Sequence, residues 1–219
     1  MIDLHTHSLL SDGELLPSEL VARAVKKGYR AIAITDHVDT SNFEWVIKNV
    51  VRVCGVLNKS QKVKVIPGAE VTYVAPDLLA GFVKEVRAMG AKIIVVHGET
   101  IVESVFPGTN RRAIEAGVDI LAHPGLISLE DAQLASRNNV YLEISTRKGH
   151  CYTNGHVLSM ARQAGAKLVL DTDTHQPGDL VTIEKAGAIA RGAGLTEEEI
   201  KTMRVDTEEL IKKIERRQV

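Results

Sequence analysis

Residues 92–97 read Lys92-Ile-Ile-Val-Val-His97, a short β-branched apolar run that ends in a histidine. A continuous apolar run of this length, flanked by turn residues, predicts a strand that is buried on both faces, as in a parallel sheet. The same pattern recurs along the chain. The predicted strands are Ile2–Leu4, Ala31–Thr35, Lys64–Ile66, Lys92–Val96, Asp119–Ala122, Val140–Ile144 and Lys167–Leu170.

Amphipathic stretches separate these runs, and several end in a glycine that is typical of a helix stop. The predicted helices are Ser18–Lys27, Phe43–Asn58, Asp77–Met89, Arg111–Ala116, Leu129–Arg137 and Gly155–Ala164. Strand–helix alternation of this kind favours a parallel sheet with helices outside it. Seven strands within about 170 residues suit a short β/α barrel better than an eight-fold barrel of about 250 residues.

The C-terminal segment is predicted to be helical, with helices at Asp179–Arg191 and Thr207–Arg217 and a capped turn at Thr196. Its charged residues are expected to form a solvated face. We expect residues 1–219 to form one domain, since neither a linker nor a repeat divides the chain.

Composition excludes several classes of function. The chain has 219 residues, 44% hydrophobic, and a formal net charge of -1, so we expect no general attraction to nucleic acid or anionic membranes. Neither a signal peptide nor an apolar run of about 18 residues is visible, which predicts a soluble cytoplasmic protein. Cys54 and Cys151 are too few for a disulfide framework or a thiolate zinc site, and are expected to be reduced and buried.

Six of the eight histidines lie just beyond a predicted strand, together with acidic residues. Barrel enzymes build their active sites on this carboxyl-terminal face, so the side chains should meet there. The residues at these strand ends are His5, His7, Asp12, His37, Glu70, His97, His123, Glu143, Asp173 and His175.

The spacing of these residues favours metal binding. Alternate residues of an extended segment point to the same side, so His5 and His7 can reach one ion, as can Asp173 and His175. Imidazole combined with carboxylate suits zinc, manganese or iron. About nine ligands are too many for one ion and match two or three divalent ions that share a carboxylate.

These residues resemble the PHP domain, the polymerase and histidinol phosphatase superfamily, in its stand-alone phosphoesterase form. The resemblance runs from Met1 to about His175. The matching motifs are His5-x-His7, Ser11-Asp12-Gly13, Thr35-Asp36-His37, Gly68-Ala69-Glu70, His97-Gly98, Ala122-His123-Pro124-Gly125 and Asp173-x-His175.

The resemblance implies a distorted seven-stranded TIM-like barrel with a di- or trinuclear metal centre. It assigns the first ion to His5, His7, Glu70 and Asp173, and the second to Glu70, His97 and His123. It assigns the third to Asp12, His37 and His175. Among these residues we predict that Glu70, Asp173 and His175 are catalytic. Paired ions can activate a water for attack on phosphorus and clamp the attacking and leaving oxygens.

Basic residues near the strand ends are candidates for substrate binding, because negative charge builds on the phosphoryl oxygens. They are Arg111, Arg112, Arg147, Lys148 and His150, of which Arg147 is favoured because its loop directly follows a strand.

Other polar residues near the strand ends have open or supporting roles. Glu143 either faces the substrate or supports a metal ligand, and Asn110 either caps a helix or contacts the substrate. Asp36 and Asp171 are expected to accept the free N–H of imidazoles, and Asp3 does the same or simply ends its strand. His156 is expected to be structural or exposed.

We expect a phosphomonoesterase that acts on a small phosphorylated metabolite. Histidinol phosphate is one option, although the short chain offers no large insertion for a substrate lid. Two alternatives stay open. One is a phosphodiesterase or nuclease acting on nucleotides or single-strand ends, although nucleic acid is an unlikely partner for a chain that is not basic. The other is a non-catalytic scaffold or RNA–protein component, which would be expected to lose metal ligands. The sequence does not fix the oligomeric state.

Overall fold

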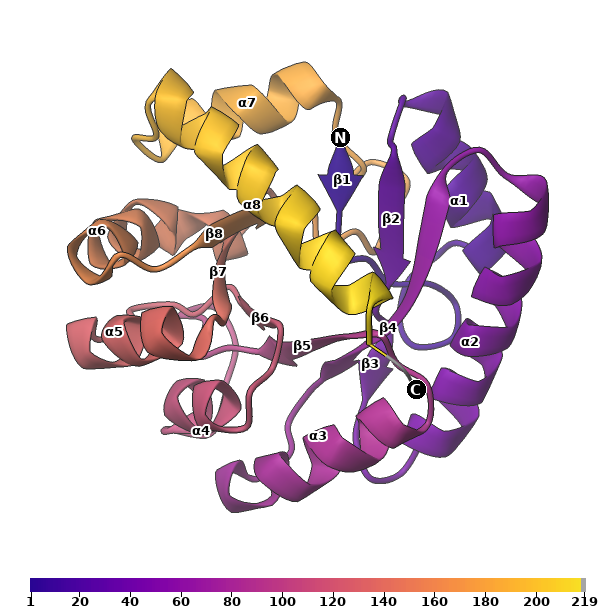
Figure 1. The fold of residues 1–219 in the computed structure, drawn as a ribbon, viewed down its shortest axis with the longest axis horizontal. Helices are drawn as coiled ribbons and strands as arrows, with labels where there is room; N and C mark the ends of the chain where they lie inside the picture. Colours follow the sequence, from indigo (N-terminus) through magenta and orange to yellow (C-terminus); the bar gives the residue numbers. More distant parts are fainter. Residues whose placement is uncertain (218–219) are drawn as a thin grey trace.

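The computed structural model describes residues 1–217 and shows a nearly closed parallel β/α barrel (Figure 1). The strands pair in the order β1-β2-β4-β5-β6-β7-β8, and β3 pairs with the far end of β4 as a continuation of β2. Their bounds are β1 (Ile2–Asp3), β2 (Ala31–Ile34), β3 (His37–Val38), β4 (Lys64–Val71), β5 (Ile93–His97), β6 (Ile120–Ala122), β7 (Tyr141–Ser145) and β8 (Leu168–Asp171). The predicted fold class is therefore confirmed.

The first and last strands close the barrel. A parallel bridge joins Thr6 to Thr174, and the buried carboxylate of Asp3 accepts a hydrogen bond from the Thr172 hydroxyl at 2.6 Å. The same carboxylate also accepts the Thr172 N–H at 3.1 Å. Asp3 therefore fastens β1 to the segment after β8, a role that the sequence did not indicate.

Helices surround the strands on the outside of the barrel (Figure 1). Following β1, β3, β4, β5, β6 and β7 in turn, they are α1 (Pro17–Lys26), α2 (Phe43–Ser60), α3 (Leu79–Ala88), α4 (Thr109–Glu115), α5 (Leu129–Asn138) and α6 (Asn154–Ala164). Short 3₁₀ turns, η1 (Pro76–Leu78) and η2 (His150–Thr153), precede α3 and α6. Each helix matches a predicted one to within a few residues.

Two further helices, α7 (Ile183–Gly192) and α8 (Glu197–Glu215), follow β8. The predicted start of α7 at Asp179 is wrong because Thr182 caps the helix and Asp179 instead accepts the N–H groups of His175 and Gln176. The predicted capped turn at Thr196 is confirmed as a capping box with Glu199, but it opens one helix that continues to Glu215.

Helix α8 crosses one end of the barrel (Figure 1). Leu210, Ile211 and Ile214 on its inner face pack against the barrel interior, and the Tyr141 hydroxyl donates to the carbonyl of Asp206. Its charged face pairs with residues at the amino ends of strands: Lys167 contacts Asp206 and Glu209. The helix thus closes the bottom of the barrel and leaves the opposite mouth open.

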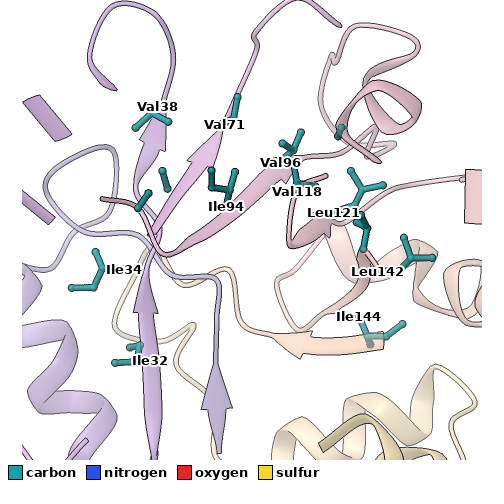
Figure 2. Close-up of a cluster of buried hydrophobic side chains, with 14 of the residues drawn as sticks. Ile32, Ile34, Val38, Val71, Ile94, Val96, Val118, Leu121, Leu142 and Ile144 are labelled. Carbon is teal, nitrogen blue, oxygen red and sulfur yellow. The ribbon is translucent and has the colours of Figure 1, made fainter. Parts of the chain in front are cut away.

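Apolar residues fill two separate layers. Outward-facing strand residues form one buried cluster with the helices, and Figure 2 shows Ile32, Ile34 and Ile94 as members of it. Their neighbours Ala31 and Ala33 point into the barrel, where small side chains leave room for the opposite strands. Above this inner layer the barrel lining becomes polar, which places charged groups at the carboxyl ends of the strands.

Both cysteines are free. Cys54 is buried as predicted, whereas Cys151 is only partly buried. Along residues 1–217, none of the helices combines the length and the apolar character needed to cross a bilayer.

Candidate metal centre

The predicted metal ligands converge at the open mouth of the barrel. They line or underlie a cavity of about 410 Å³, whose walls come from the segments that follow the strands. His5, His7 and Glu70 are fully buried, and Asp173 is 2% exposed. A chain that scatters these residues over more than 160 positions therefore brings them to one place.

Glu70, on β4, is the centre of the cluster. Its Oε2 lies 3.2 Å from His5 Nε2, 3.3 Å from His7 Nε2 and 2.9 Å from His37 Nδ1. Its Oε1 lies 3.3 Å from His97 Nδ1 and 3.6 Å from His123 Nε2. One carboxylate thus faces five imidazoles on two sides, which is the geometry that a bridging ligand requires.

Asp173 faces the same space from the opposite wall. Its Oδ1 lies 3.6 Å from His5 Nε2, 3.3 Å from His7 Nε2 and 3.3 Å from His175 Nδ1. Its Oδ2 lies 3.8 Å from His123 Nε2. Asp173 and Glu70 therefore enclose the imidazoles between two acidic groups.

The ligand atoms fall into groups that are compact enough to hold an ion each. These groups are His5–His7–Glu70, His5–His123–Asp173, Glu70–His97–His123 and His7–Asp12–His37–His175. The third group is the set that the family resemblance assigns to a second ion. The fourth contains the set assigned to a third ion, with His7 added.

Metal ions fit these groups because many of the buried polar atoms have no hydrogen-bond partner among the described residues. They include Nε2 of His5, both ring nitrogens of His7, Oε2 of Glu70, Nε2 of His97 and Nδ1 of His123. Leaving such atoms unpaired costs free energy, and imidazole nitrogens with carboxylate oxygens are the ligands of zinc, manganese and iron.

The electrostatics of the cluster favour the same conclusion. Burial, with the charge of Glu70, raises the pKa of Asp173 to about 8 despite the opposing charges of His5 and Arg147. Burial also lowers the pKa of His123 to about 4. A divalent cation would replace the proton on the carboxyl group and bind the neutral imidazole, so metal binding would be coupled to proton release.

Glu143, on β7, holds two candidate ligands in place. Its Oε1 lies 2.7 Å from His5 Nδ1, and its Oε2 accepts the backbone N–H of His123 at 2.8 Å. The side chain is fully buried beneath the cluster. It therefore lies where it can fix the His5 tautomer, with Nε2 free to bind metal, and not on the substrate side.

Asp36 and Asp171 do not accept hydrogen bonds from imidazoles, so this part of the sequence prediction is wrong. Asp36 accepts the N–H of Ser8 at 2.7 Å and the hydroxyls of Ser8 and Ser11 at 2.8 Å. Asp171 accepts the N–H of Leu4 at 2.6 Å. Both carboxylates satisfy backbone donors of the segment that carries His5 and His7, and so position these histidines indirectly.

His150 and Glu103 add two groups to the cavity wall. His150 Nε2 lies 3.4 Å from Glu103 Oε1 and 3.7 Å from Asp173 Oδ2, and Glu103 Oε2 lies 3.1 Å from His97 Nε2. Thr100 holds the other nitrogen of His150 at 2.9 Å. Glu103 is not predictable from the sequence because it lies in an irregular loop, six positions after His97, where no spacing rule applies.

Of the predicted basic residues, only Arg147 and His150 line the cavity. The Arg147 guanidinium donates to the carbonyl of Asp173 at 3.0 Å and contacts the ring of His175. Arg111 instead pairs with Asp131 at 2.8 Å, Arg112 pairs with Asp77 and Glu115, and Lys148 is exposed. The structure therefore does not bring Arg111, Arg112 or Lys148 into the site.

Asn110 has neither of its two predicted roles. Its side chain accepts the N–H of Glu99 and donates to the carbonyl of Pro124, both at 2.9 Å, and so joins the loops after β5 and β6. Gly125 makes this junction possible, because it has a φ of +60° and a Cβ there would lie 1.9 Å from the Glu99 carbonyl oxygen. His156 is structural, since its Nε2 lies 2.8 Å from the carbonyl oxygen of Ile127.

Comparisons with known proteins agree with this fold. Residues 3–100 match the model of the PHP domain. An uncharacterized protein of Methanocaldococcus jannaschii is 45% identical over 97% of this chain and 99% of its own length. A probable phosphatase of Thermoanaerobacter sp. strain X514 is 27% identical over 90% of this chain and 88% of its own length.

Two solved structures are similar in fold. A chain of an archaeal ribonuclease P solved with mature tRNA has a TM-score of 0.74 and 18% identity, over 96% of this chain and 90% of its own. Histidinol phosphate phosphatase from Lactococcus lactis, complexed with zinc, L-histidinol and phosphate, has a TM-score of 0.62 and 17% identity, over 89% of this chain and 94% of its own.

Proposed function

Because the chain belongs to the PHP domain family, we propose that it is a metal-dependent phosphoesterase that hydrolyses phosphate esters of a small metabolite. The family includes a probable phosphatase that resembles this chain over nearly its full length. The similar fold of a zinc-containing histidinol phosphate phosphatase supports the same reaction class. We propose that residues 1–219 act as one such domain.

The observation that carries the proposal is the set of buried, unpartnered ligand atoms around Glu70. Two or three divalent ions, zinc, manganese or iron, would be held by His5, His7, Asp12, His37, Glu70, His97, His123, Asp173 and His175. All nine positions carry a competent side chain, which argues against a scaffold that has lost its metal.

Bound ions would supply an activated water and neutralise the charge that builds on the phosphoryl oxygens. The protein's own residues set the geometry around them. Glu143 fixes the tautomer of His5, and Arg147 presents a guanidinium to the cavity for a phosphoryl oxygen. His150 faces the same cavity from η2, so we assign it to contact with the ester oxygen or the leaving group.

One observation favours phosphodiesters as a second candidate substrate class. Among the described residues that line the cavity, Arg147 is the single Lys or Arg, whereas Asp12, Asp39, Glu103 and Asp173 are acidic. A diester carries one negative charge and needs less compensation than a dianionic monoester. Cyclic nucleotides and single-strand ends belong to this class, and a ribonuclease P chain shares the fold.

A substrate panel tests the proposal. Purified protein supplied separately with zinc, manganese and iron is assayed on phosphomonoesters, including histidinol phosphate, and on bis(p-nitrophenyl) phosphate. We expect metal-dependent release of phosphate, with a loss of at least a hundredfold in Asp173→Ala and a fall in its bound metal. Full activity and full metal occupancy in this variant would refute the assignment. Diester hydrolysis alone would favour the second candidate.

A further inference from the structure

Tyr73 is an exposed aromatic side chain inside an otherwise polar cavity. It follows β4 by two residues, lines the cavity and is 53% exposed. Its ring centroid lies 5.7 Å from that of His97 at an interplanar angle of 40°. Apart from Val38 and the histidines, the described residues that line the cavity are polar or charged. Tyr73 thus offers a planar apolar surface beside the metal ligands.

The backbone at Tyr73 is strained. Its φ is +54°, a conformation that a bulky side chain rarely adopts. Four residues other than glycine have a positive φ in the described chain: Tyr73, His123, Asn139 and Asp173. Asn139 is the C-cap of α5, where this conformation is usual, whereas His123 and Asp173 belong to the candidate metal centre. Strain that persists in a well-packed protein marks functional positions, and here it groups Tyr73 with the site.

The contacts of Tyr73 leave its ring available. Tyr73 and Glu103 both line the cavity, so the ring lies in the same space as the loop between β5 and α4. The cavity, at about 410 Å³, is far larger than a phosphate group needs, since a water occupies about 30 Å³. It therefore has room for the organic part of a substrate beside the phosphate group. Further exposed apolar side chains lie on the β5–α4 loop, among them Ile101 and Phe106.

From this geometry we propose that Tyr73 is a specificity-determining residue that stacks on a planar aromatic group of the substrate. This inference rests on the proposed phosphoesterase function and specifies its substrate class. The substrates are phosphate esters whose organic part carries an aromatic or heteroaromatic ring. Phosphate would be held at the metal centre, and the ring would lie against Tyr73 in an offset or edge-to-face arrangement.

The test compares the binding of phenylphosphonate and methylphosphonate to metal-loaded protein by calorimetry. Neither probe has an ester bond to hydrolyse, so the result does not depend on turnover. The variants are Tyr73→Phe, which keeps the ring, and Tyr73→Leu, which keeps apolar bulk without a ring. Tyr152→Leu, on an exposed residue outside the cavity lining, is the matched control. Metal content and Tm are measured for each protein.

We expect the wild type to prefer phenylphosphonate, and Tyr73→Leu to reduce this preference by roughly three- to tenfold with metal content unchanged. Tyr73→Phe and Tyr152→Leu should keep the preference for phenylphosphonate within about twofold of the wild-type value, because both retain an aromatic ring at position 73. An equal affinity for both probes in the wild type would overturn the inference, as would an unchanged preference in Tyr73→Leu. Ester turnover without a phenyl preference refutes the stacking alone, and a phenyl preference without turnover refutes only the esterase function.

Discussion

Replacing Glu143 by glutamine should weaken metal binding without unfolding the protein. The carboxylate makes two contacts in a fully buried site: 2.7 Å to Nδ1 of His5 and 2.8 Å to the N–H of His123. A glutamine has the same shape but only one acceptor oxygen. If that oxygen keeps the His123 N–H, the amide NH₂ faces His5 and demands the tautomer whose proton sits on Nε2, the nitrogen that faces Glu70.

The opposite amide orientation keeps the His5 contact but sets the NH₂ group against the backbone N–H of His123. The first arrangement changes the tautomer of His5, and the second disturbs the backbone that carries His123. Loss of such a supporting carboxylate typically costs 10- to 100-fold in metal affinity. This range corresponds to about 1.4–2.7 kcal/mol. We expect this loss for the ion that His5 binds, and a smaller change for an ion at the Asp12 side of the cluster.

The assay is competition with a chromophoric chelator for zinc or manganese, alongside circular dichroism to verify folding. Glu19→Gln is the matched control, because it removes an equal charge from an exposed pair with Arg23. It should bind metal as the wild type does. Unchanged affinity at every site in Glu143→Gln would refute the reasoning that His5 is a metal ligand oriented by this carboxylate.

Three further predictions test the fold and the site. Leu210→Ala in α8 should lower the free energy of unfolding by about 3 kcal/mol and Tm by about 6–12 °C, because Leu210 is fully buried in the barrel end. The control Val205→Ala, on the exposed face of the same helix, should change Tm little. Equal thermal unfolding of the two variants would contradict the packing of α8. Arg147→Ala should lower kcat/KM for a phosphate ester by about 10- to 100-fold, because it removes the guanidinium from the cavity. The control Arg111→Ala, outside the cavity, should keep kcat/KM near the wild-type value. Equal losses in steady-state kinetics would contradict the placement of Arg147. The metal-free protein should lose thermal stability as pH rises from about 6.5 to 8, because the folded state holds protons on Asp173 and His97. Burial raises the pKa of Asp173 to about 8, and for His97 the carboxylates of Glu103 and Glu70 outweigh burial and raise the pKa to about 9. Bound metal should remove this loss, and a metal-free Tm that rises across this interval would contradict it.

The barrel and most of its polar mouth were predictable from the sequence because both follow from short-range patterns. Runs such as Ile93–Val96 specify strands, and a ligand that directly follows a strand must lie at the carboxyl end of the barrel. The nine candidate ligands were therefore predicted to lie together without knowledge of their contacts, and the structure places them at one mouth of the barrel. The role of α8 was not predictable, since the burial of Leu210 and Ile214 depends on the far side of the barrel.

The supporting contacts were harder to predict because they depend on loop conformation and on competition between donors. Asp36 lies beside His37 in the sequence, yet its carboxylate accepts hydrogen bonds from the backbone N–H and hydroxyl of Ser8 and the hydroxyl of Ser11, and not from an imidazole. Glu143 follows the same strand-end rule as the ligands, and only its position beneath His5 shows which side it faces. Glu103 and Arg111 also differ because of loop conformation. The loop that carries Glu103 brings this side chain to the cavity, whereas helix α4, which follows the loop, turns Arg111 outward to Asp131.

The metal content of the purified protein decides whether the open mouth of the barrel is a metal centre. The protein is saturated with zinc or manganese, dialysed to remove loosely held ions, and analysed by inductively coupled plasma mass spectrometry. We expect two or three ions for each chain, held by imidazoles and carboxylates around Glu70. A content below one ion for each chain, in folded protein, would contradict it.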